Sequence, residues 1–131
     1  MRQRDIFVIA AVLLLLAACS PGEPETAFSD LPEGDAARGE MLFSQSINEA
    51  PACNTCHRVD GVTIVGPPLD GFGETGAERV EGQSAAEYAY FSIVRPSRHV
   101  VRGYSNVMFS DYESKLSAQD IADLIAYLTR L

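Results

Sequence analysis

The run Cys53-Asn54-Thr55-Cys56-His57 is the sequence feature that most limits what this chain can fold into. Its C-x-x-C-H pattern is typical of covalent haem attachment. Two thiols three positions apart lie about one helical turn from each other, so both can form thioether bonds to vinyl groups on one edge of a porphyrin. The histidine after the second cysteine then turns under the ring and offers a nitrogen to the iron. The motif therefore predicts a haem bound by Cys53, Cys56 and His57.

Three other interpretations of the motif are a disulfide, a thioredoxin-like redox pair and half of a zinc site. A zinc site needs a second pair of ligands at suitable spacing, and the only other cysteine and histidine in the chain are Cys19 and His99. A thioredoxin-like motif should occur beside a β-α-β pattern, and the sequence shows none. Haem attachment is therefore the favoured interpretation.

The first 18 residues have the pattern of a secretory signal peptide. Positive charge near the start is followed by an uninterrupted apolar run from Ile6 to Ala18. As a helix this run spans about 20 Å, less than the roughly 30 Å hydrocarbon core of a membrane. Its ending, Leu-Ala-Ala before Cys19, resembles a bacterial lipobox, which implies that Cys19 becomes the lipid-carrying N-terminus. An ordinary signal peptide followed by a stray cysteine is the alternative.

Composition divides the rest of the chain into a tether and one domain. Residues 19–34 are rich in proline, glutamate and serine, which predicts a flexible acidic tether, and residues 35–131 form the domain. The whole chain has 18 acidic and 10 basic residues, a net charge of -8. It has no basic stripe to neutralise phosphates, which argues against nucleic-acid binding. The acidic balance favours a transient partner with a basic docking patch.

Three helices are predicted in the domain, each with a polar side chain that can cap its first turn. They start after Asp35, Ser84 and Ser117. The first covers residues 36–43, the second ends near residue 94 because residue 95 precedes a proline, and the third runs close to the end of the chain. The segments 61–76 and 96–113 show no helical or strand period and are expected to be loops.

The third helix carries an apolar face that must pack against another element. Ile121, Leu124, Ile125 and Leu128 recur at helical spacing. The first helix is the best candidate, because Gly39 inside it costs roughly 1 kcal/mol against alanine and can mark a close helix crossing. We therefore expect these two helices to cross.

Met108 is the leading candidate for the sixth ligand of the iron. It is the only methionine after the haem motif, and methionine with histidine raises the haem potential relative to two nitrogen ligands. His99 is the competitor, and an open or labile site is the third possibility. Arg95, Arg98 and Arg102 lie nearby in the sequence and could bind the haem propionates or form a basic patch. The sequence does not choose between these roles.

With these residues in place, the chain from about residue 31 to 131 resembles a class I c-type cytochrome. The family's order is a first helix with a glycine and an aromatic residue, the haem motif, a Gly-Pro-Pro-Leu segment, a distal methionine, and a last helix with Ala-Tyr-Leu near its end. The matching positions are Gly39, Phe43, Cys53, Cys56, His57, Gly66-Pro67-Pro68-Leu69, Met108 and Ala126-Tyr127-Leu128.

The resemblance implies an all-α fold, in which the N- and C-terminal helices cross and further helices surround one covalently bound haem c. It implies that Cys53 and Cys56 hold the haem, that His57 is the proximal ligand, that the Pro67 carbonyl accepts the imidazole N–H, and that Met108 is the distal ligand.

Residues 93–117 are also similar to the cytochrome c domain of haem-copper oxidase subunit II. One departure from the family is Phe109, which stands where a proline usually follows the distal methionine. That proline shapes the ligand loop, so the departure bears on the strength of the iron–sulfur bond.

The resemblance implies a one-electron carrier with no catalytic residues, not an enzyme. Its expected partners are membrane or periplasmic redox proteins, such as a quinol-oxidising complex, a terminal oxidase or a dehydrogenase. We expect a monomer held by its lipid on the periplasmic side of the bacterial cell membrane, with the outer membrane left open. The alternatives are a haem subunit of a dehydrogenase or oxidase complex, and a haem sensor with a labile Met108.

Overall fold

The computed structural model describes residues 26–131, so the predicted signal peptide, Cys19 and the first part of the tether lie outside the described residues. Within this range the chain is helical and has no β-strand, only an isolated bridge between Ile47 and Ala50. The α-helices are α2 (Ala36–Phe43), α3 (Phe72–Thr75), α4 (Ala85–Val94), α5 (Tyr112–Lys115) and α6 (Ala118–Leu128). Short 3₁₀ turns cover Phe28–Asp30, Cys53–Thr55, Gly76–Glu78 and Pro96–Arg98. The all-α fold predicted from the sequence is confirmed.

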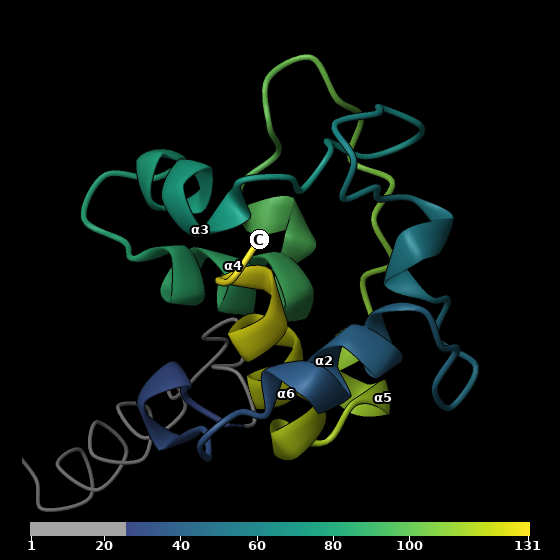
Figure 1. Ribbon diagram of the computed structural model, residues 1–131, viewed down its shortest axis with the longest axis vertical. Helices are drawn as coiled ribbons and strands as arrows, with labels where there is room; N and C mark the ends of the chain where they lie inside the picture. The colour runs from purple at the N-terminus through teal and green to yellow at the C-terminus, as the bar shows by residue number, and fades with distance from the viewer. Residues whose placement is uncertain (1–25) are drawn as a thin grey trace, which may run out of the picture.

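Helices α2 and α6 pack against each other at one end of the molecule (Figure 1). Gly39 lies at their closest approach, because a Cβ atom there would stand 2.0 Å from the carbonyl oxygen of Asp123 and 2.8 Å from the Cβ of Tyr127. The rings of Phe43 and Tyr127 also meet, with centroids 5.5 Å apart. The predicted crossing is confirmed, and it requires glycine at position 39.

The long helices begin where their caps predict. The Asp35 carboxylate accepts from the amide of Ala37 at 2.9 Å. Ser117 and Asp120 form a complete capping box at the start of α6. Ser84 makes only half of such a box, because its hydroxyl accepts from the amide at position 87 and no return bond is formed. Capping is a local interaction, so the sequence is enough to locate these helix starts.

Both segments expected to be loops contain short helices. Helix α3 lies inside 61–76, and α5 lies at the end of 96–113 and extends beyond it. Tertiary contacts fix α3: the buried ring of Phe72 stacks on Tyr88 with centroids 6.0 Å apart, and the Gly73 amide donates to the Leu131 carbonyl at 3.2 Å. A four-residue helix is too short to show a period, so the sequence could not reveal it.

Residues 26–34 pack on the domain, whereas the sequence assigned them to a flexible tether. The Phe28 ring contacts the Tyr90 ring at 5.6 Å, and the Tyr90 hydroxyl donates to the Thr26 carbonyl. Further along, the Gln119 side chain donates to the Glu33 carbonyl at 2.9 Å. The acidic composition hid this docking, because one aromatic ring and two backbone carbonyls are enough to hold the segment.

An acidic side chain is buried where α2 and α6 cross. Asp123 has no exposed area and accepts hydrogen bonds from the Asp35 amide at 2.6 Å and from Gln119 at 2.8 Å. Arg38 of α2 pairs with both Asp120 and Asp123. Burial by itself would raise the pKa of Asp123, but these bonds hold that pKa below its ordinary value. The cluster ties the start of α2 to α6.

Candidate functional site

The C-x-x-C-H motif forms a tight turn that brings its three reactive side chains to one cavity wall. The amides of Cys56 and His57 both donate to the Cys53 carbonyl, at 3.1 and 3.0 Å. The two cysteines are free thiols rather than a disulfide. Burial, with a smaller contribution from Cys56, raises the pKa of Cys53 to about 11, so this thiol stays protonated at neutral pH.

The imidazole of His57 is held in one tautomer. Its Nδ1 lies 2.8 Å from the carbonyl oxygen of Pro67. A carbonyl can only accept, so Nδ1 must carry the proton, and Nε2 keeps its lone pair in the neutral ring. A histidine oriented in this way by a backbone carbonyl is suited to bind a metal through its other nitrogen. The contact implied by the family resemblance is therefore present.

The segment after the motif folds back and closes over the imidazole. The Gly66 amide donates to the Cys56 carbonyl at 2.8 Å, and the Leu69 amide donates to the Arg58 carbonyl at 2.7 Å. A Cβ atom at position 66 would stand 2.4 Å from the His57 Cε1 and 2.8 Å from its Nδ1. Only glycine lets the backbone lie this close to the ring. The sequence marks this segment by its Gly-Pro-Pro-Leu pattern but does not reveal this role of Gly66.

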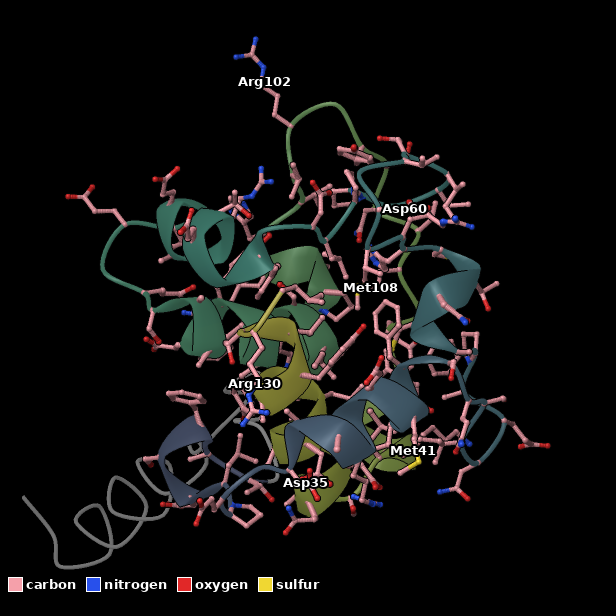
Figure 2. The ribbon with its side chains drawn as sticks, in the orientation of Figure 1. Asp35, Met41, Asp60, Arg102, Met108 and Arg130 are labelled. Atoms are coloured by element: carbon pink, nitrogen blue, oxygen red, sulfur yellow. The ribbon has the colours of Figure 1, made fainter. Side chains whose placement is uncertain are left out.

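A cavity of about 350 Å³ lies in the middle of the domain, and Cys53, Cys56, His57 and Met108 all line it. Figure 2 shows Met108 in this central region of the molecule. The rest of the wall is mostly apolar and comes from α2, α3, α4, α6 and the loops that join them, with Phe43, Phe72, Ile93 and Leu128 among its members. The volume falls in the range of small-molecule and cofactor sites. Two thiols, one imidazole held by a backbone carbonyl and one thioether around an apolar cavity fit a covalently held haem.

The loop that carries Met108 is braced by two aromatic rings. The ring of Phe109 packs edge to face on Tyr112, with centroids 5.0 Å apart, and the Tyr112 hydroxyl donates to the Pro51 carbonyl at 2.8 Å. Burial raises the pKa of Tyr112, so its hydroxyl remains a donor. Phe109, which replaces the usual proline, therefore has a structural partner. Nothing in the local sequence marks Tyr112 as part of the site, because its partners are distant in the chain.

The competing ligand His99 also lines the cavity. It is exposed, and its ring meets the edge of Tyr88 with centroids 5.7 Å apart. Met108 is half-buried. The structure brings both residues to the same cavity, so Met108 and His99 remain two candidates for one position.

The three arginines of this region are separate from one another and from the cavity wall described above. Arg95 pairs with Glu113, and the guanidinium of Arg98 lies 3.8 Å above the centre of the Phe91 ring. Arg102 stands at the end of a loop and extends into solvent (Figure 2). None of the three lines the cavity.

The zinc-site interpretation of the motif can be checked in the described part of the chain. Residues 26–131 contain no group of three histidine, cysteine or acidic side chains that could hold a metal ion, so a zinc site lacks its ligands there.

None of the helices in residues 26–131 has the length and apolar character needed to cross a membrane.

Fold and site together define a small helical domain built around a cofactor cavity with a C-x-x-C-H wall. The model of the cytochrome c family matches residues 36–131. The chain therefore belongs to the cytochrome c family, whose members bind haem c covalently and transfer electrons through it. A comparison with curated proteins found no match. The match covers the domain from the start of α2 to the last residue.

Proposed function

We propose that this chain carries one haem c and passes single electrons between redox proteins. Cys53 and Cys56 hold the haem, His57 is the proximal ligand, and Met108 is the distal ligand. The observation that supports this assignment is the shared cavity, around which two thiols, a tautomer-fixed imidazole and a thioether converge. When bound, haem c supplies an iron that cycles between Fe(III) and Fe(II).

The residues of this chain hold the ligand set still while the charge of the iron changes. The Pro67 carbonyl fixes the His57 ring and makes its free nitrogen more basic. The mostly apolar wall places few polar groups around the cofactor, and surroundings of this kind help to set the reduction potential. The Phe109 and Tyr112 rings keep the Met108 loop in place. A site whose ligands do not move suits electron transfer better than ligand exchange.

The experiment is to produce the protein with a haem-maturation system and to measure covalent haem and a reversible redox titration. We expect one haem per chain and a single one-electron wave. Replacing Cys53 and Cys56 with alanine should abolish covalent haem. Intact protein that matures without haem would overturn the proposal.

The proposed carrier is anchored through a lipid on Cys19 and works on the periplasmic side of the bacterial cell membrane. The lipobox-like ending and the acidic segment after it support this placement, and the likeness of residues 93–117 to an oxidase-linked domain supports respiratory partners, such as a quinol-oxidising complex and a terminal oxidase. A Cys19→Ser variant should leave the membrane fraction and keep its haem spectrum. Retention of that variant in the membrane would contradict the anchor.

The alternative function is a haem sensor in which Met108 leaves the iron easily. The optical spectrum of the reduced protein with carbon monoxide distinguishes such a sensor from an electron carrier. The packing of Phe109 on Tyr112 favours a fixed loop, and therefore the carrier. Carbon monoxide should leave the reduced spectrum unchanged at neutral pH if Met108 stays bound. Rapid carbon monoxide binding without denaturant would favour the sensor.

A further inference from the structure

Residues 26–34 form a strap that is held along the surface of the domain. A 3₁₀ turn in the strap places Phe28 and Leu31 on the same side, because side chains three positions apart eclipse in such a turn. Both side chains are half-buried and pack against the core. The hydroxyl of Tyr90 in α4 donates to the Thr26 carbonyl. The first end of the strap is therefore held by α4.

The other end of the strap is held by α6. A Cβ atom at Gly34 would stand 2.2 Å from the carbonyl oxygen of Ala122, so only glycine lets the strap lie this close to the helix. The Gln119 side chain donates to the Glu33 carbonyl at 2.9 Å. The strap is thus fixed at both ends and is part of the folded domain.

Docking of the strap shortens the free chain between the domain and a lipid on Cys19. With the strap docked, residues 19–25 are the link, and seven extended residues reach about 25 Å at most. With the strap released, the link is residues 19–34 and reaches about 58 Å. A domain of the size of residues 26–131 is about 33 Å across. The docked link is therefore shorter than the domain, and the released link is longer.

The opening of the cofactor cavity lies at the end of the molecule opposite the strap. We call residues 58–66 and 98–107 the rim loops, because they supply exposed residues of the cavity wall. Figure 2 shows Asp60 and Arg102 of these loops near the top and Asp35, which follows the strap, near the bottom. In Figure 1 the strap begins at the lower left and the rim loops lie at the top. The rim can touch the membrane that holds the chain only if the strap end stands a whole domain diameter above that membrane.

The rim loops have the composition of a surface that binds lipid. Seven large apolar side chains are exposed in residues 26–131, and all except Met41 belong to these loops. The six are Val59, Val62, Ile64, Val65, Val100 and Val107. Arg58 pairs with Asp60. Arg98 and Arg102 are the excess charge of the loops. Exposed apolar area beside positive charge binds bilayers that contain anionic lipids, so a rim that could reach the bilayer would bind it and close the cavity opening.

We propose that the docked strap keeps the rim loops off the membrane that carries the chain. The link is then limited to about 25 Å, so the rim of a domain about 33 Å across cannot turn down to the bilayer. The strap thereby keeps the cavity opening available to partners that stand above the membrane. This inference rests on the lipid anchor of the proposed function, and it gives a role to residues whose composition predicts only a flexible tether.

Digestion of the haem-loaded protein with a glutamate-specific protease measures docking of the strap. The bond between Glu33 and Gly34 lies against α6, so its cleavage rate follows the population with an open strap. Phe28→Ser should speed this cleavage by about tenfold through lost apolar burial, and Tyr90→Phe by about fivefold through the lost hydrogen bond. Met41→Ser is the matched control, because Met41 is 55% exposed and lies in α2, and it should leave the rate unchanged. Cleavage of the parent as fast as of Phe28→Ser would overturn the docked strap.

The position of the rim is measured with the lipidated, haem-loaded protein in vesicles. The vesicles contain phosphatidylglycerol and phosphatidylcholine with fluorescein on some headgroups, and haem quenches this dye by energy transfer that falls steeply with distance. We expect weak quenching for the parent and for Met41→Ser. The strap variant Phe28→Ser, Tyr90→Phe should raise the ratio of membrane-bound to free rim by more than about tenfold.

A second pair of substitutions identifies the surface that reaches the membrane. Val62 and Ile64 are 51% and 47% exposed and do not line the cavity wall. Adding Val62→Ser and Ile64→Ser to the strap variant should lower the ratio of bound to free rim by at least about tenfold, because less apolar area is then buried in the bilayer. Extra quenching that survives these two changes would overturn the inference, since the rim would then not be the contact.

The outcomes separate this inference from the proposed function. Equal quenching in the parent and the strap variant, with haem and lipid both present, would refute only the role of the strap. A protein without haem would refute the electron-transfer function, and cleavage after Glu33 would still test the strap. A haem-loaded parent that leaves the membrane fraction would overturn the anchor and this inference with it, and the electron carrier would stand.

Discussion

Substituting Gly66 with alanine should loosen the proximal histidine, and the structure gives the size of the effect. The new Cβ would stand 2.4 Å from the His57 Cε1, whereas carbon atoms in contact prefer about 3.5 to 4.0 Å. The ring or the backbone must therefore move by more than about 1 Å. A movement of this size breaks the 2.8 Å contact between Nδ1 and the Pro67 carbonyl, and a lost buried hydrogen bond costs about 1 to 3 kcal/mol.

A loss of stability in Gly66→Ala would be informative, because glycine-to-alanine changes at positions that can accept alanine normally stabilise a protein by about 0.4 to 1 kcal/mol. We expect Gly66→Ala to lower the free energy of unfolding by about 1 to 2 kcal/mol. We also expect it to raise the haem potential, because an imidazole without its carbonyl partner is a less basic donor and stabilises Fe(III) less. Urea titration and redox titration measure the two effects. Val62→Ala in the same loop is the control, since that residue is exposed and lies off the cavity wall. A Gly66→Ala protein as stable as the parent, with an unchanged potential, would refute the role of Gly66.

Three further changes test the fold around the site. Gly39→Ala should lower the unfolding free energy by at least about 2 kcal/mol by forcing two helix backbones apart, and a neutral result in urea titration would contradict the crossing. Asp123→Asn should remove stability that the parent has above about pH 4 and loses as pH falls through the depressed pKa of this carboxyl; identical pH profiles of unfolding would contradict the buried cluster. Tyr112→Phe should cost about 1 kcal/mol by deleting the bond to Pro51 and should weaken the methionine charge-transfer band, whereas an unchanged band would show that the loop needs no such brace.

Local chemistry explains what could be predicted from the sequence. The starts of α2 and α6 depend on side chains that bond to amides two or three residues away, so Asp35 and Ser117 could be assigned without a structure. The haem motif is equally local, and its five consecutive residues indicate the chemistry once the rest of the sequence offers no second pair of zinc ligands and no β-α-β pattern. The helix crossing at Gly39 could be predicted because a glycine inside a helix needs a reason.

Long-range contacts explain what could not be predicted. The burial of Asp123 depends on Arg38, 85 positions earlier in the chain, and the start of α6 alone suggests only an exposed acid near a helix end. Tyr112 belongs to the site through the Pro51 carbonyl, 61 positions away. The packing of Phe28 on Tyr90 is a third contact between residues that are far apart in the chain. None of these pairs shows a period or a motif that a reading of the sequence could use.

The proposed pair of iron ligands is tested by the oxidised optical spectrum of the haem-loaded protein, recorded for the parent, Met108→Ala and His99→Ala. We expect the weak methionine-to-iron charge-transfer band in the parent and in His99→Ala, and its loss in Met108→Ala. A parent without the band, or a band that survives in Met108→Ala, would contradict the assignment of Met108 as the distal ligand, and with it the case for a carrier with two fixed ligands.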